Sequence, residues 1–130
     1  MDNKAELKVL GIINTQPLAN EFGHLQTDEV IVTNERIDHI KSHHPQDYEL
    51  FESFGKEAVT FPDEIIKDLK RAGTVFMVKK LPDTNLNVVV RLALDVDKEG
   101  LKNSVMTFYR LRDRNLRKLR EKNKPLYKRE

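Results

Sequence analysis

Alternation of apolar and polar residues is clearest between Leu86 and Asp95, where every second residue, beginning with Leu86, is apolar. Successive side chains of a strand point to opposite faces, so this pattern predicts a strand with one fully apolar face. Residues 74–81 are also rich in strand formers, a turn is expected at 82–85, and residues 103–110 alternate again. These segments predict an antiparallel meander.

Helix signals are concentrated in the second quarter of the chain. Thr33 or Asn34 can cap a first helix, and Pro45 should end it, because a residue before proline disfavours the helical conformation. Pro45 can also open a second helix, which Gly55 is expected to end.

Shorter segments complete the pattern. Apolar runs at 7–13 and 30–32 predict brief strands. Between 62 and 73, the order of proline, acidic residues, basic residues and glycine favours a short helix, with a strand at 64–67 as the alternative. After the last strand, a stripe of two leucines among charged residues predicts a basic C-terminal helix.

The pattern as a whole predicts one α+β domain over residues 1–130. Its expected architecture has N-terminal helices packed on a three- to four-stranded antiparallel sheet, followed by the basic C-terminal helix. We interpret residues 1–29 as an N-terminal extension that carries a first strand.

Composition restricts the chemistry that the chain can perform. It contains no cysteine, which excludes disulfides, a thiolate nucleophile and cysteine-ligated zinc. No apolar run approaches the roughly twenty residues of a membrane span. The segment Met1–Glu6 lacks the basic and apolar regions of a secretion signal. We therefore expect a soluble cytoplasmic protein without membrane contacts.

The net charge of +2 hides an asymmetry along the chain. Residues 110–130 contain ten Lys and Arg against three acidic residues and carry +7, so residues 1–109 carry −5. Because binding of phosphates to Lys and Arg releases counterions, a basic tail indicates a polyanionic partner. A solvated helix whose charges only keep the protein soluble is the alternative.

Three of the four histidines cluster at the expected end of the first helix. His39 and His43 have the spacing of two metal ligands on one helical face. The residue after His39 is Ile40, however, where the His-Glu-x-x-His pattern needs glutamate, and no third ligand is evident. His44 precedes Pro45 and should leave the helical path. Two imidazoles near a phosphate can act as general base and general acid, and surface or capping histidines are the alternative.

Short blocks of sequence match a known family in order. They are Val30–Ile37, His39-Ile40, His44-Pro45, Asp47-Tyr48, Pro62-Asp63, Lys79-Lys80, Val88–Leu92, Asn103–Phe108 and Leu126–Lys128. In these blocks the chain resembles phage- and mobile-element-borne nucleases of the Barnase–EndoU–colicin–RelE-like superfamily, which are metal-independent ribonucleases. The resemblance leaves residues 1–29 outside.

The resemblance implies helices packed on an antiparallel sheet whose polar face forms an RNA cleft. It also implies a strand after Pro62-Asp63, which overrides the local helix signal there. The implied reaction is attack of the RNA 2′-hydroxyl on the adjacent phosphorus, which leaves a 2′,3′-cyclic phosphate and needs neither metal nor cofactor. A toxin that cuts RNA, with transfer RNA as one target class and an antitoxin protein as inhibitor, fits such a family.

The resemblance also suggests catalytic residues. His39 and His44 are the expected acid–base pair, and Arg91 is expected to bind the phosphorane through two parallel hydrogen bonds. The other interpretation of Arg91 is an ion pair with Asp95 or Glu64.

Further candidates come from the strands. Lys80 is a candidate catalytic cation and Lys79 a candidate substrate contact, although these neighbours point to opposite faces and only one should reach the cleft. Thr107 completes the catalytic set, with strand propensity as its other explanation. The remaining substrate contacts are expected from Asn103, Ser104, Tyr109 and Arg117.

Two other classes of function fit the same residues. The chain could be a catalytically silent nucleic-acid-binding module whose basic tail contacts phosphates. It could also be a protein-interaction module whose basic helix docks an acidic partner.

Overall fold

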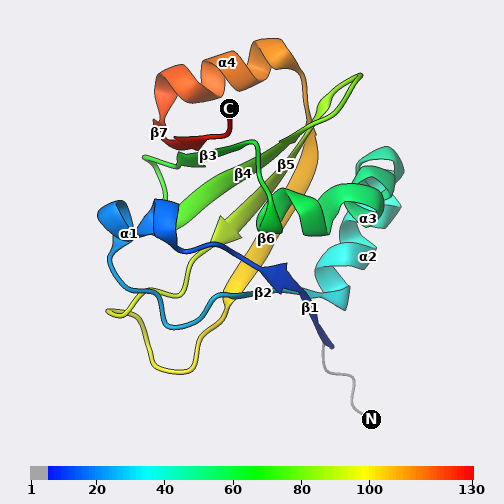
Figure 1. Ribbon diagram of the computed structural model, residues 1–130. Helices are drawn as coiled ribbons and strands as arrows, with labels where there is room; N and C mark the ends of the chain where they lie inside the picture. Colours follow the sequence, from blue (N-terminus) through cyan, green and yellow to red (C-terminus); the bar gives the residue numbers. More distant parts are fainter. Residues whose placement is uncertain (1–5) are drawn as a thin grey trace.

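The computed structural model describes residues 6–130, so the interpretation of Met1–Glu6 lies almost entirely outside the described range. Helices are interspersed among the strands along the chain (Figure 1). In order they are β1 (Leu7–Ile12), α1 (Gln16–Phe22), β2 (Glu29–Thr33), α2 (Asn34–His43), α3 (Pro45–Thr60), β3 (Glu64–Lys67), β4 (Thr74–Lys80), β5 (Asn85–Arg91), β6 (Asn103–Leu111), α4 (Asp113–Lys122) and β7 (Lys124–Lys128).

The strands form one seven-stranded sheet in the order β1-β2-β6-β5-β4-β3-β7. Strands β2 and β6 pair in parallel, whereas the other neighbours are antiparallel. The predicted three- to four-stranded antiparallel sheet is therefore wrong, and so is the placement of the helices mainly at the N-terminus. The meander β4-β5-β6 was visible in the alternation, but it is only the centre of the sheet.

Strands β3 and β7 are short and weakly patterned, so that β3 was expected only from the resemblance and β7 was missed. Strand β3 has four residues, too few for a clear period of two, and β7 contains Pro125 among basic residues. Proline is tolerated there because β7 is an edge strand. The basic helix α4 is consequently not terminal, since β7 follows it.

Local chemistry explains the helix boundaries. The Thr33 side chain caps α2 by accepting a hydrogen bond from the backbone N–H of Arg36 at 3.1 Å. Helix α3 runs past Gly55 to Thr60, so the predicted end at Gly55 is wrong. A Cβ at Gly55 would lie 2.7 Å from the ring of Phe51, which shows that this glycine makes room for a core aromatic residue. The strand expected after Pro62-Asp63 is present as β3.

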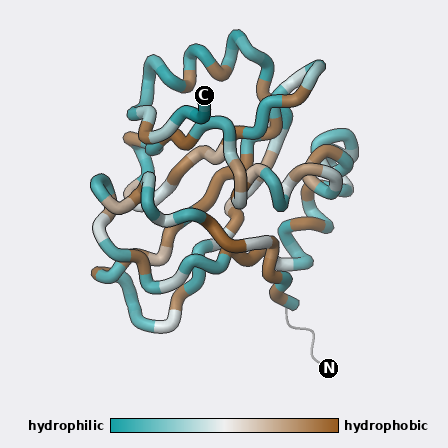
Figure 2. Tube along the Cα trace, in the orientation of Figure 1, coloured by the Kyte–Doolittle hydropathy of each residue, from teal (hydrophilic) through white to brown (hydrophobic). Residues whose placement is uncertain are grey.

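The two faces of the sheet carry separate hydrophobic clusters. The larger cluster joins Leu18 of α1 and Phe51 of α3 to alternate residues of the strands. The smaller one packs Leu116 of α4 against the opposite face, together with Phe76 and Val89. Figure 2 shows that apolar residues follow the strands, whereas α4 is mostly hydrophilic. We call the sheet surface under Leu116 the α4 face.

A buried ion pair fastens α4 to this face. The Arg120 guanidinium donates two hydrogen bonds, of 2.7 and 2.6 Å, to the carboxylate of Glu64, whose side chain is 2% exposed. Lys80 approaches the same carboxylate at 3.3 Å. These cations lower the pKa of Glu64 against the opposing effect of burial. Between residues 6 and 130, no helix is long and apolar enough to cross a membrane.

Candidate functional site

A groove on the α4 face is the strongest candidate site. Its volume is about 410 Å³, and it is assembled from the turn between β3 and β4, the central strands and the end of α4. The lining residues are Asp68, Lys70, Arg71, Phe76, Val89, Thr107, Tyr109, Leu119, Lys122 and Asn123. Thr107 and Tyr109 were expected from the sequence, and both reach this groove because they are alternate residues of β6.

The floor of the groove contains the phenol of Tyr109, which is paired with a fully buried amide outside the groove lining. Asn87 of β5 lies directly opposite Tyr109 of β6, and its Nδ2 donates to the Tyr109 hydroxyl at 3.0 Å. Burial raises the pKa of Tyr109, and the nearby Asp68 carboxylate adds to this effect, whereas the Asn87 hydrogen bond and Arg71 oppose it. Tyr109 therefore stays protonated at neutral pH and can act as a hydrogen-bond donor.

The rim of the groove is basic. Lys70, Arg71 and Lys122 are exposed and form no ion pair within residues 6–130. Exposed cations around a partly desolvated floor favour binding of an anion such as a phosphodiester.

Hydrogen bonds hold the turn that carries two of these cations. The Asp68 Oδ1 accepts from the backbone N–H of Lys70 at 2.8 Å. Asn123 Oδ1 accepts from the backbone N–H of Leu69 at 3.0 Å, which ties the turn to the end of α4. The two rims of the groove are thereby fixed relative to each other.

Arg91 lies on the α4 face but is engaged within the fold. Its guanidinium donates to the carbonyl of Leu92 and, at 3.2 Å, to Asp97 Oδ1. A backbone hydrogen bond from Leu94 and this contact with Arg91 lower the pKa of Asp97. The partner of Arg91 is thus Asp97, instead of Asp95 or Glu64. Arg91 does not line the groove.

The two neighbouring lysines of β4 point to opposite faces, as the alternation predicted. Lys79 lies 3.5 Å from Glu57 and 3.9 Å from Asp63. Lys80 points to the α4 face and pairs with Glu64. Both lysines are therefore neutralised by carboxylates.

The histidines lie apart from the groove lining. His39 and His43 are exposed on α2, their rings stack with centroids 4.4 Å apart, and His43 Nδ1 lies 2.8 Å from the carbonyl oxygen of His39. His44 leaves the helical path with φ −141°, and its carbonyl accepts from the backbone N–H groups of Asp47 and Tyr48. His44 therefore forms an exposed corner between α2 and α3. Over residues 6–130, no group of three or more His, Asp and Glu side chains is arranged to hold a metal ion.

The three remaining candidates either form hydrogen bonds within the fold or lie outside the groove. Asn103 is fully buried, donates to the carbonyls of Thr27 and Glu29, and accepts from the backbone N–H of Ala93. Ser104 donates to the carbonyl of Lys102 at 3.2 Å. Arg117 is exposed on α4 and does not line the groove.

Sequence reasoning missed most of the rim and the buried Asn87 that contacts Tyr109. Lys70 and Arg71 did carry a signal, because they form a basic pair between the strand expected at 64–67 and Gly73. Asp68, Asn87 and Lys122 carried none, since nothing local shows that β5, the turn after β3 and the end of α4 converge.

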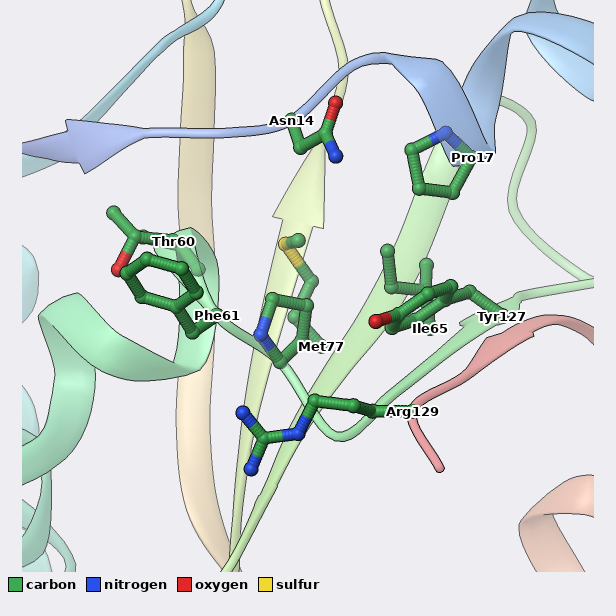
Figure 3. A pocket seen from close by; sticks show the side chains of 10 residues that line it. Asn14, Pro17, Thr60, Phe61, Ile65, Met77, Tyr127 and Arg129 are labelled. Atoms are coloured by element: carbon green, nitrogen blue, oxygen red, sulfur yellow. The ribbon is translucent and has the colours of Figure 1, made fainter.

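A second hollow lies on the opposite face of the sheet. Its volume is about 150 Å³, and its walls include Ile65 and Met77 of the larger hydrophobic cluster. Phe61, Tyr127 and Arg129 surround its opening (Figure 3). Arg129 pairs with Asp63 at 2.9 Å. This mostly apolar hollow offers fewer groups for polar chemistry than the groove.

Comparison with known proteins assigns the chain to a family. Residues 8–128 match the family described as phage-Barnase-EndoU-ColicinE5/D-RelE like nuclease2, and the match begins well before Val30, where the recognised sequence blocks start. Searches of curated proteins and of solved structures found no match. The suspected resemblance is confirmed: the chain belongs to this family of phage-Barnase-EndoU-ColicinE5/D-RelE like nucleases.

Proposed function

We propose that this nuclease is an endoribonuclease that binds RNA in the groove and cleaves it by attack of the 2′-hydroxyl on the adjacent phosphorus. The products would carry a 2′,3′-cyclic phosphate and a 5′-hydroxyl. The observation that carries the proposal is the groove itself, which combines hydroxyl groups on its floor with rim cations that form no ion pair within residues 6–130.

The chemistry needs donors that stabilise the phosphorane oxygens and a base and an acid for the two reacting oxygens. Arg71 is proposed to bind the reacting phosphate, because Arg91 is engaged with Asp97. Thr107 is a candidate hydrogen-bond donor to the same phosphate. Lys70 and Lys122 would bind neighbouring phosphates on the two rims.

His39 and His44 remain the proposed acid–base pair. Their exposure supports this role, and neither forms an ion pair with a carboxylate within residues 6–130. The two regions lie on opposite faces of the sheet, because Thr107 lines the groove on the α4 face and Ile40 of α2 belongs to the larger hydrophobic cluster on the other face. RNA that contacts both the groove and the histidines must therefore extend around the sheet.

The first experiment tests the reaction. Purified protein is incubated in EDTA with a short RNA and with matched RNAs that carry a single 2′-deoxy nucleotide. We expect cleavage of the RNA, cyclic phosphate ends by 3′-end mapping, and loss of cleavage at each deoxy position. Cleavage at deoxy positions would contradict the 2′-hydroxyl mechanism.

The same experiment separates the alternatives. RNA binding with steep salt dependence but without any product would instead support a catalytically silent binding module. Mapping of RNA ends in cells that express the chain tests whether transfer RNA is the target and whether expression is toxic. If the chain is toxic, an inhibitor protein is expected as its partner.

A further inference from the structure

The buried side chain of Asn87 lowers the stability of the folded protein. Its side chain is fully buried in β5, and its Oδ1 has no hydrogen-bond partner in the part of the chain that the structure describes. A buried acceptor without a partner loses the hydrogen bonds that water would give it, so it destabilises the folded state. An apolar residue here would match the members of the cluster under α4, such as Val78 and Val89. A compensating use of the amide is therefore expected.

The contact with Tyr109 supplies that use. The Asn87 Nδ2 donates to the Tyr109 hydroxyl at 3.0 Å, so the phenol oxygen serves as acceptor toward the protein. The phenol proton then remains for another acceptor. Because the two residues lie directly opposite each other on β5 and β6, this contact also fixes the direction of the ring.

The surroundings favour an anionic acceptor. Tyr109 lines the groove together with Arg71, which forms no ion pair within residues 6–130. Burial and the Asp68 carboxylate raise the pKa of Tyr109, so that the phenol remains neutral and keeps its proton near neutral pH. A neutral phenol and a guanidinium on one groove are suited to two different oxygens of a single phosphate.

We infer that Tyr109 is a catalytic hydrogen-bond donor to a nonbridging oxygen of the reacting phosphate, and that Asn87 is its positioning residue. This inference rests on the proposed function. The phenol donates a hydrogen bond without transferring its proton, so the acid and base of the reaction are other groups. The hydrogen bond strengthens as negative charge develops on the phosphorane oxygen, which lowers the barrier for cleavage.

The main test compares Tyr109→Phe with wild type on RNA. The variant removes only the hydroxyl group, and Tyr127→Phe makes the same chemical change on the opposite face of the sheet. Loss of one preorganised donor typically lowers kcat by about 10²–10³-fold. We expect such a decrease for Tyr109→Phe, an RNA dissociation constant close to that of wild type, and full activity for Tyr127→Phe.

Phosphorothioate RNA tests the contact itself. Sulfur replaces one nonbridging oxygen at the cleaved position, in each of the two stereoisomers. Since sulfur accepts hydrogen bonds poorly, one isomer should slow wild type more than it slows Tyr109→Phe. Equal sulfur effects in both proteins would overturn the assigned contact.

Asn87→Leu tests the positioning role. We expect a lower kcat with little change in KM, together with an equal or higher melting temperature, because the unpaired amide oxygen is gone. Ultraviolet titration, with Tyr109→Phe to identify the signal, should show a higher pKa for Tyr109 in this variant, since the Asn87 hydrogen bond lowers it.

The outcomes distinguish the two proposals. Wild-type protein that does not cleave RNA would overturn the proposed function and this inference together. Wild-type cleavage that Tyr109→Phe retains at full kcat would overturn this inference and leave the proposed function in place. Loss of kcat in Tyr109→Phe with full kcat in Asn87→Leu would overturn only the positioning role of Asn87.

Discussion

The histidine corner and the groove differ in how the chain builds them. The corner consists of His39, His43 and His44, which come from one short segment and lie exposed to water on and after α2. The groove draws its residues from a turn, three strands and a helix that are far apart in sequence. Candidate reactive side chains can therefore be named from sequence, whereas the proposed phosphate-binding environment appears only when the sheet is assembled.

The two regions also differ in electrostatics. Charges and hydrogen bonds act more strongly in a partly desolvated groove than on a surface helix, where water screens them. The groove is thus suited to stabilising a phosphorane, and the exposed histidines are suited to exchanging protons with solvent. If both serve one reaction, their contributions can be separated by single substitutions.

The largest effect is expected from the histidines. His39→Ala and His44→Ala should each lower the single-turnover cleavage rate by about 10²–10⁴-fold, as loss of an acid or base typically does. His43→Ala, which removes the neighbouring ring on the same helix, should cleave at nearly the wild-type rate. Wild-type rates for both His39→Ala and His44→Ala would move the acid–base chemistry elsewhere and leave the groove as the whole candidate site.

The next largest effect concerns the helix that forms one rim of the groove. Arg120→Ala removes the bidentate partner of the buried Glu64, and breaking a buried ion pair typically costs about 3–5 kcal/mol. We expect a loss of that order in the free energy of unfolding, measured in urea. Arg114→Ala, at an exposed position of α4, should stay within about 0.5 kcal/mol of wild type. Equal stability of the two variants would show that α4 does not depend on this pair.

Sequence predicted the fold best where the pattern was long. The alternation in β5 and β6 identified their apolar faces, although β5 ends at Arg91, before Asp95, where the alternation stops. The short strand β7 gave no comparable signal. It pairs with β3, which lies far away along the chain, so the local pattern does not show this pairing. The parallel pairing of β2 with β6 depends on long-range packing and has no local signal.

The site was predictable in the same uneven way. Strand alternation correctly separated Lys79 from Lys80 and put Thr107 and Tyr109 on one face. It could not show that Lys80 is neutralised by Glu64, or that Asn103 is buried in contacts with backbone. Residue type and spacing thus identify candidate side chains. Whether such a side chain can contact a substrate depends on its burial and on whether an ion pair already neutralises its charge.

A smaller effect distinguishes the groove from the exposed side of α4. Lys122 lines the groove, whereas Arg117 of the same helix does not. Loss of a phosphate contact reduces the slope of log K against log salt by about one. We expect this change for Lys122→Ala and the wild-type slope for Arg117→Ala, measured by RNA binding over a salt series. Equal slopes in both variants would favour a diffuse basic surface over a defined groove.

The smallest expected effect concerns the ion pairs of Glu21, on the side of the sheet that faces away from the groove. Glu21 of α1 pairs with Lys67 of β3 at 2.5 Å and with Lys124 of β7 at 2.7 Å. These hydrogen bonds, first that of Lys124 and then that of Lys67, lower the pKa of Glu21 from 4.5 to about 2. A carboxyl group whose pKa is depressed on folding stabilises the protein above its unfolded pKa and loses this contribution as pH falls through the folded value.

Glu21→Gln should therefore reduce stability at neutral pH, and its difference from wild type should shrink as pH falls from 4.5 toward 2. Unfolding in urea across this range measures the difference. Glu49→Gln, an exposed position without an ion pair in residues 6–130, controls for the general loss of one carboxylate.

RNA cleavage at neutral pH should be unchanged in folded Glu21→Gln, because α1 packs against β7 and contributes no residue to the groove. Reduced cleavage without unfolding would mean that the two faces of the sheet are coupled, and that the groove is not defined by the α4 face alone.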